Sequence, residues 1–168
     1  MDLTIEHMGI IALVILTGLS AGLCFTWSNS ITPGIGRLND LGYLASFQQM
    51  NRTILNPTFF IVFFGPLFLG LINLYVFKNA SNSIIGLLIL AIGIYLFGVL
   101  MVTIFVNVPL NEILDKTDLS SASSEDLKSL REKFEVKWNR LHLIRTISSI
   151  TSFIVLIIGL IQITKNNI

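Results

Sequence analysis

The sequence predicts an all-α protein: a transmembrane four-helix bundle with a short amphipathic helix between spans 1 and 2 and a long last helix extending beyond the bilayer. Three observations predict this fold. Of the 168 residues, 53% are hydrophobic and only 12% are charged. Four apolar stretches are each long enough to cross a bilayer, which takes ~20 helical residues. From Glu125 onward, no residue that breaks helices occurs before Gly159.

The four spans are expected at about residues 8–27, 59–77, 84–106 and 144–163, in a single integral membrane domain that comprises residues 1–168. The first span is interpreted as retained. Asp2, Glu6 and His7 precede it, whereas a cleaved signal peptide would begin with basic residues.

Basic residues are concentrated in two connections, 29–58 and 107–143, which four spans would place on one side of the membrane. Only Lys78 and Lys165 fall on the other side. The positive-inside rule therefore predicts a multi-pass protein of the cell membrane with both connections in the cytoplasm and both termini outside. The basic residues of the two connections are Arg37, Arg52, Lys116, Lys128, Arg131, Lys133, Lys137 and Arg140.

The first connection contains a predicted amphipathic helix at residues 38–55. Apolar side chains such as Leu44 alternate there with polar ones such as Gln48, a pattern typical of a helix on the membrane face or folded back on the bundle. Asn56-Pro57 is expected to end this helix and start the second span, because proline suits the first turn of a helix.

Two further prolines mark a predicted turn and a predicted helix break. Thr32-Pro33-Gly34 indicates a turn that opens the first connection. Pro109, between Asn107 and Asn111, is expected to break the third span, with the asparagines as partners for the freed backbone groups. The last helix should pack on the 38–55 helix through an apolar stripe, which comprises Leu127, Leu130, Phe134, Trp138 and Leu141.

A polar stripe marks the entry of the last helix into the membrane. Trp138, His142 and Arg145 share one face at helical spacing. An ionisable residue at that depth is costly unless it faces protein or water, so the stripe is expected to line a pocket inside the bundle near one membrane face. The other spans contribute polar groups at the same level. The catalytic candidates are His142 and Arg145, and the substrate-binding candidates are Trp27, Asn51, Asn56, Asn107, Asn111, Trp138 and Asn139.

Simpler interpretations of these residues stay open. Trp27 and Trp138 could belong to an interfacial aromatic belt, and Arg145 could extend to the lipid headgroups. The asparagines could cap broken helices, and His142 could be a structural histidine.

Several classes of function are disfavoured. The net charge of +1 gives no nucleic-acid footprint. No carboxylate lies inside a predicted span, which argues against a proton or cation relay. No spacing of metal ligands or Gly-rich phosphate loop appears, so neither a metal nor another cofactor is expected.

Three motifs resemble a family of small four-span proteins that includes the fungal anthrone oxygenases. They are the segment from Met50 to Phe59 following Pro33, the segment Asn107-Val108-Pro109-Leu110-Asn111, and the run from Trp138 to Thr146. For some fungal members, the resemblance implies oxidation of an anthrone to an anthraquinone by dioxygen without a known cofactor.

This resemblance implies a base, an oxyanion partner and an aromatic slot. His142 would be the base, Arg145 with Asn107 or Asn111 would hold a developing phenolate, and Trp27 and Trp138 would stack on the flat substrate. The expected partners are therefore membrane lipids and a lipophilic aromatic small molecule. The alternative function is a non-catalytic membrane protein that binds a lipid or quinone, or supports a partner protein.

Overall fold

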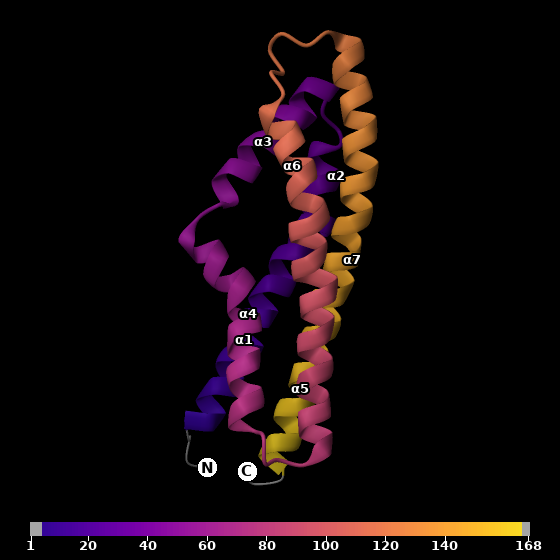
Figure 1. Ribbon diagram of the computed structural model, residues 1–168. Helices are drawn as coiled ribbons and strands as arrows, with labels where there is room; N and C mark the ends of the chain where they lie inside the picture. The colour runs from indigo at the N-terminus through magenta and orange to yellow at the C-terminus, as the bar shows by residue number, and fades with distance from the viewer. Residues whose placement is uncertain (1–4, 166–168) are drawn as a thin grey trace.

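The computed structural model describes residues 5–165, and no strand occurs in that range. Four long helical rods run roughly side by side, and a shorter helix crosses one end of the bundle (Figure 1). The elements are α1 (Ile5–Thr26), η1 (Trp27–Ile31), α2 (Thr32–Ile35), α3 (Asp40–Ile54), α4 (Pro57–Val76), α5 (Asn82–Tyr95), η2 (Leu96–Met101), η3 (Thr103–Asn107), α6 (Val108–Lys116) and α7 (Ser124–Lys165).

The four rods are long and apolar enough to cross a membrane. They cover Ile5–Ile35, Pro57–Val76, Asn82–Lys116 and Ser124–Lys165, with mean hydropathies of 2.3, 2.2, 2.8 and 2.1 in their most apolar windows. The predicted helical bundle is confirmed, and the chain is a multi-pass membrane protein.

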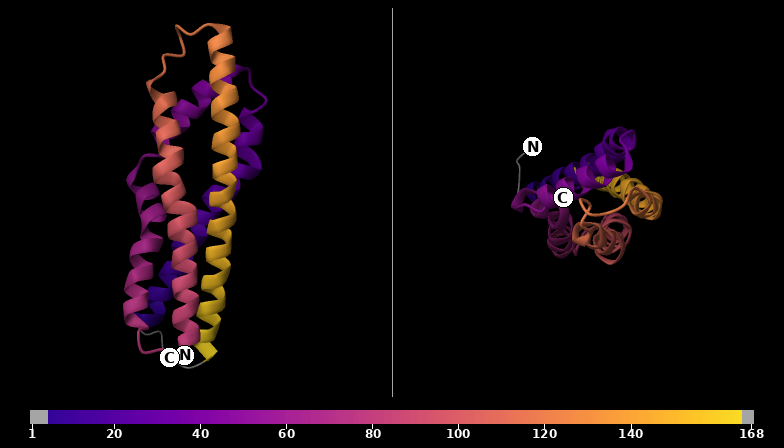
Figure 2. Two further views of the ribbon diagram at one scale, coloured as in Figure 1. Left: turned by 45° about the vertical axis from the view of Figure 1, so that its right-hand side comes forward. Right: turned by 90° about the horizontal axis from the view of Figure 1, so that it is seen from above.

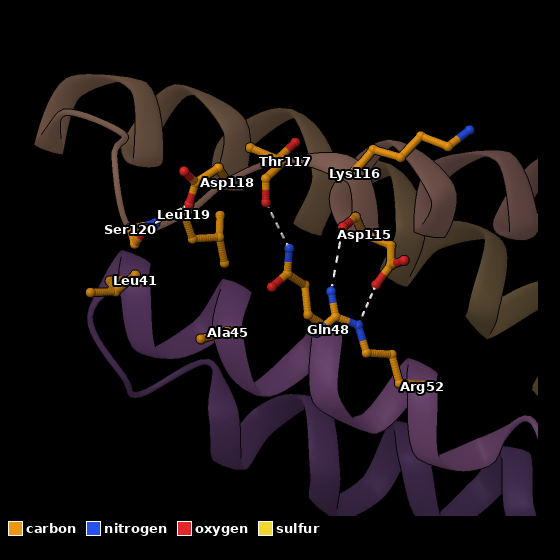
Figure 3. A pocket seen from close by; sticks show the side chains of 10 residues that line it. All are labelled: Leu41, Ala45, Gln48, Arg52, Asp115, Lys116, Thr117, Asp118, Leu119 and Ser120. Carbon is orange, nitrogen blue, oxygen red and sulfur yellow. Dashed lines mark hydrogen bonds and ion pairs between the residues drawn. The ribbon is translucent and has the colours of Figure 1, made fainter.

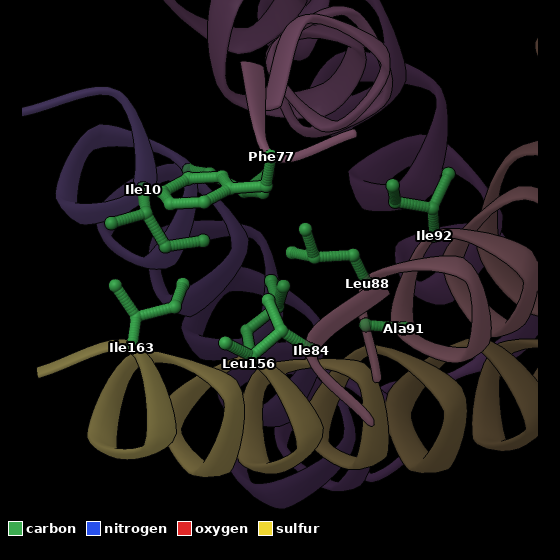
Figure 4. Close-up of a cluster of buried hydrophobic side chains, with 9 residues drawn as sticks. Ile10, Phe77, Ile84, Leu88, Ala91, Ile92, Leu156 and Ile163 are labelled. Atoms are coloured by element: carbon green, nitrogen blue, oxygen red, sulfur yellow. The ribbon is translucent and has the colours of Figure 1, made fainter. Parts of the chain in front are cut away.

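The lower half of the bundle is held by an apolar core drawn from all four rods. Ile10 of α1, Leu88 of α5 and Leu156 of α7 converge there, with Phe77 at the end of α4 (Figure 4). A bilayer supplies no hydrophobic force between helices, so close packing of these side chains must hold the rods together. This core holds the rods in register, so that their upper ends lie beside one another.

The last helix is continuous for 42 residues, as predicted. Ser123 starts it with a reciprocal cap: its hydroxyl accepts from the Asp126 amide at 3.2 Å and donates to the Asp126 carboxylate at 2.6 Å. The N-terminal half of the helix rises beside α3 and α6 at the upper end of the bundle (Figure 2).

Helix α3 is the predicted amphipathic helix, and it packs on α7 as expected. Asn39 caps it by accepting from the Gly42 amide at 2.8 Å. Phe47 contacts Phe134 and Trp138 edge-on, with ring centroids 4.8 and 4.7 Å apart. The predicted stripe of α7 is therefore the surface on which α3 lies.

Arg131 of α7 binds the turn that leads into α3. Its guanidinium donates to the carbonyls of Gly36 and Leu38 at 2.8 Å each and pairs with Asp40 at 3.1 Å. It also pairs with Glu135 at 2.7 Å. Because only 15% of this side chain is exposed, the ion pairs are better shielded than ordinary surface pairs.

The helix break predicted at Pro109 is wrong, and the turn predicted over Thr32 to Gly36 begins only at Gly36. The first rod continues through Pro33 to Ile35, and the third continues through Pro109 to Lys116. In each case a π-helical segment ends just before the proline, which then lies in the first turn of the next α-helix. The missing N–H costs little in a first turn, so the rods pass both prolines unbroken. Asn56 and Pro57 start α4 as predicted.

Candidate functional site

An aromatic cluster lies where α3 meets the first and last rods. The His142 ring stacks on Trp138 at 4.7 Å with an interplanar angle of 15°. Trp27 is tilted against both rings, with its centroid 5.8 Å from Trp138 and 6.4 Å from His142. Phe47 covers the cluster from α3, 5.8 Å from Trp27. Rings from α3, η1 and α7 thus form one aromatic cluster that includes the imidazole, and Trp138 is the ring that stacks on it.

One hydrogen bond fixes the protonation pattern of the neutral His142 ring. Nε2 lies 3.0 Å from the Cys24 carbonyl oxygen, which can only accept. Nε2 therefore carries the hydrogen, and Nδ1 carries a lone pair. Nδ1 is buried and has no partner within the described chain. The imidazole is held by one nitrogen and presents the other as a free acceptor.

Arg145 points into the bundle beside this imidazole. Its guanidinium carbon lies 5.9 Å from the Trp138 ring centre, and the group is within electrostatic range of the Cys24 thiol and the Tyr95 hydroxyl. Its Nε is buried without an acceptor. A buried donor without a partner is costly, so this N–H is available to a ligand.

Several other buried polar atoms at this end of the bundle also have no partner within the described residues. Asn107 is completely buried, and neither its amide nitrogen nor its amide oxygen is bonded. The remaining atoms of this kind at this end are Trp27 Nε1, the Tyr43 hydroxyl oxygen, Asn51 Nδ2 and Asn139 Oδ1. A native interior leaves few such atoms, so each of them is a candidate contact for a bound molecule.

Two of these side chains come from π-helical segments. Trp27 begins η1 and Asn107 ends η3. The extra residue in a π turn redirects the side chains that follow, and such turns are frequent at functional sites. Here they bring an indole and an amide to the level of His142 without breaking either rod.

Comparison of the sequence with known proteins identifies the family of the chain. The family model described as anthrone oxygenase matches residues 59–155, more than half of the chain. The chain belongs to the anthrone oxygenase family. No curated protein and no solved structure matches it. The matched segment contains Asn107, Trp138, His142 and Arg145.

In this anthrone oxygenase family member, the other asparagine candidates have different environments. Asn111 accepts from Trp138 Nε1 at 2.8 Å and so orients the indole. Asn139 and Asn51 are half-buried, each with one polar atom lacking a partner. Asn56 uses both polar groups locally, accepting from the Phe59 amide and donating to the Thr53 carbonyl. The structure places Asn56 as a helix cap, the simpler of its two interpretations.

Sequence reasoning missed three groups of the candidate site. Phe47 was recognisable only as part of an apolar helix face. The Cys24 carbonyl, which also accepts from Thr146 Oγ1 at 3.3 Å, is backbone and carries no sequence signal. Tyr95 lies below Arg145, where its hydroxyl donates to the Phe63 carbonyl at 2.8 Å and bonds to Ser20 at 2.8 Å. A single tyrosine within an apolar span was the available signal for it.

The open cavity in the structure lies apart from the predicted site residues. A hollow of about 570 Å³ lies between α3 and α6, lined in part by Gln48, Arg52 and Asp115 (Figure 3). None of the predicted site residues lines it. Gln48 donates to the Leu114 and Thr117 carbonyls, and Arg52 pairs with Asp115 at 2.6 Å, so these groups already have partners.

Among the ionisable groups at this end of the bundle, Tyr43 and Asp118 have pKa values shifted in opposite directions. Burial raises the pKa of the Tyr43 hydroxyl above its ordinary range, so the group beside Phe47 stays neutral. Hydrogen bonds from Ser120 and Ser121 lower the pKa of the exposed Asp118 carboxyl. Within residues 5–165, no three His, Cys, Asp or Glu side chains gather as a metal-binding group.

Proposed function

We propose that this protein is a cofactor-independent oxygenase that oxidises a flat, lipophilic anthrone or phenol in the membrane. One observation carries the proposal: His142 presents an unpartnered Nδ1 lone pair inside an aromatic cluster, beside the unpartnered donor of Arg145. Membership of the anthrone oxygenase family supports the class of substrate. The neighbouring indoles of Trp27 and Trp138 supply aromatic surface that a planar ring system could contact.

The proposed reaction begins with a proton transfer. His142 Nδ1 removes a benzylic proton from the anthrone, and the electron pair is delocalised onto the ring carbonyl, which becomes a phenolate. Arg145 Nε–H and the Asn107 amide N–H stabilise that oxygen as its negative charge develops. Both donors lack partners within the described protein, so donation to a phenolate breaks no existing bond of theirs.

Dioxygen then reacts with the electron-rich anion. Electron transfer to O₂ and formation of a carbon–oxygen bond, with return of the proton from His142, give a hydroperoxide at the benzylic carbon. Loss of water breaks the oxygen–oxygen bond and the remaining benzylic carbon–hydrogen bond, leaving a second carbonyl. One CH₂ group thus becomes a carbonyl, and one O₂ supplies the carbonyl oxygen and the oxygen of water.

Oxygen uptake by the purified chain with an added anthrone tests this proposal. We expect one O₂ to be consumed per anthraquinone formed, faster than with heat-denatured protein and unaffected by a metal chelator. Labelled O₂ should place one of its atoms in the quinone. An uptake rate equal to that of the denatured control contradicts the proposal. Quenching of Trp27 and Trp138 fluorescence by the anthrone without uptake indicates the non-catalytic binding function instead.

We also propose that residues 1–168 form one integral membrane domain of the cell membrane, oriented with the α3 end in the cytoplasm. The motivation is the concentration of Lys and Arg in the two connections at that end. Reporter fusions at the C-terminus should be active only when the reporter functions outside the cytoplasm. A C-terminal fusion that is active only in the cytoplasm contradicts this orientation.

A further inference from the structure

The outer face of α7 carries three cations just before the helix becomes apolar. Lys133, Lys137 and Arg140 recur every three or four residues, so they form one stripe along the helix. All three are exposed. This stripe lies away from the face on which Phe134 and Trp138 pack against α3, so it takes no part in the aromatic site.

The charges of the stripe are not neutralised within the protein. Among residues 5–165, the ion pairs involve Arg52, Arg131 and Lys116, and none involves the stripe. The nearby carboxylate of Glu135 pairs with Arg131 on the α3 side of the helix. No acidic residue occurs between Val136 and Ile144. The cationic face is therefore available to an anion from outside the bundle.

The same helix face becomes apolar immediately below the cations. Ile144, Ile147 and Ile158 continue it, with exposed fractions of 44%, 58% and 44%. At 1.5 Å per residue, Arg140 lies about 6 Å above Ile144 and Lys133 about 16 Å above it. Long basic side chains span part of that distance, which places the stripe beside the headgroup layer.

We propose that this face binds an anionic phospholipid, with its phosphate on the stripe and its acyl chain along the isoleucines below. A phospholipid presents charge and hydrocarbon in the same order as the helix face does. Juxtamembrane basic residues attract anionic lipids, and the attraction fades within a Debye length of ~10 Å, so Arg140 should contribute most and Lys133 least. A free phosphate could bind the cations, but it has no hydrocarbon chain to contact the isoleucines.

Native mass spectrometry of the full chain in detergent tests this proposal, with phosphatidylglycerol and phosphatidylcholine added separately. We expect phosphatidylglycerol to bind more tightly. Arg140→Gln should weaken its binding by about fivefold, Lys133→Gln by less, and the triple variant should abolish the preference. Lys128→Gln is the matched control, because Lys128 lies on the same helix about 18 Å farther from the membrane than Arg140.

The outcomes separate the lipid from other anions. The proposal is overturned if the triple variant keeps its preference for phosphatidylglycerol, or if Lys128→Gln weakens binding as much as Arg140→Gln. It is also overturned if inorganic phosphate competes with the lipid at equal concentration, because the isoleucines would then contribute nothing. Thermal unfolding of each variant with phosphatidylcholine confirms that the fold is intact before binding is compared.

Discussion

Replacement of His142 by phenylalanine is expected to lower the rate of anthrone oxidation by roughly 10²–10⁴-fold, the usual contribution of a general base. Phenylalanine keeps a ring that can stack on Trp138, as the imidazole does at 4.7 Å. It removes the Nδ1 lone pair. The Cys24 carbonyl loses one donor but keeps Thr146 Oγ1 at 3.3 Å. The substitution therefore removes the base with little other change, and steady-state oxygen uptake measures the result.

The chain provides a matched control, because His7 is its second histidine and lies near the start of α1, at the opposite end of the bundle (Figure 1). His7→Phe is expected to leave the rate unchanged. A His142→Phe protein that binds the anthrone and oxidises it at the original rate excludes His142 as the base. The proton would then have to pass to another group.

The fold could be predicted largely because its signals are local. The apolar spans, the uninterrupted segment after Glu125 and the Asn56-Pro57 helix start each depend on a few neighbouring residues. The errors at Pro33 and Pro109 have one cause. A local rule treats proline as the end of a helix, but here a π turn precedes each proline and the rod continues, and the sequence pattern did not predict those π turns.

The candidate site was predictable to a lesser extent. Helical spacing alone placed Trp138, His142 and Arg145 on one face, and their contacts in the structure agree with that placement. The partner that fixes the imidazole is a backbone carbonyl, at Cys24, and no side-chain pattern reports it. For Asn56 the side chain itself was ambiguous, since asparagine before proline is equally suited to a cap and to a ligand contact.

Replacement of Arg145 by leucine is expected to reduce the maximal oxidation rate by about 10²–10³-fold, the effect of removing one donor from a developing oxyanion. Substrate affinity should change less, because the charge on the phenolate develops only during the reaction. Leucine also removes a buried N–H that has no partner, so the fold should tolerate it. The kcat and KM of oxygen uptake, with thermal unfolding as a check on folding, separate these effects.

The conservative variant distinguishes this role from that of an arginine that merely reaches the lipid headgroups. Lysine keeps the charge but lacks the Nε–H beside the ring of Trp138, so Arg145→Lys should recover only a small part of kcat. Arg140→Gln, one turn away on the exposed side, should leave kcat unchanged even where it weakens lipid binding. Full activity in Arg145→Lys would mean that only the positive charge matters, and the oxyanion contact through Nε would be wrong.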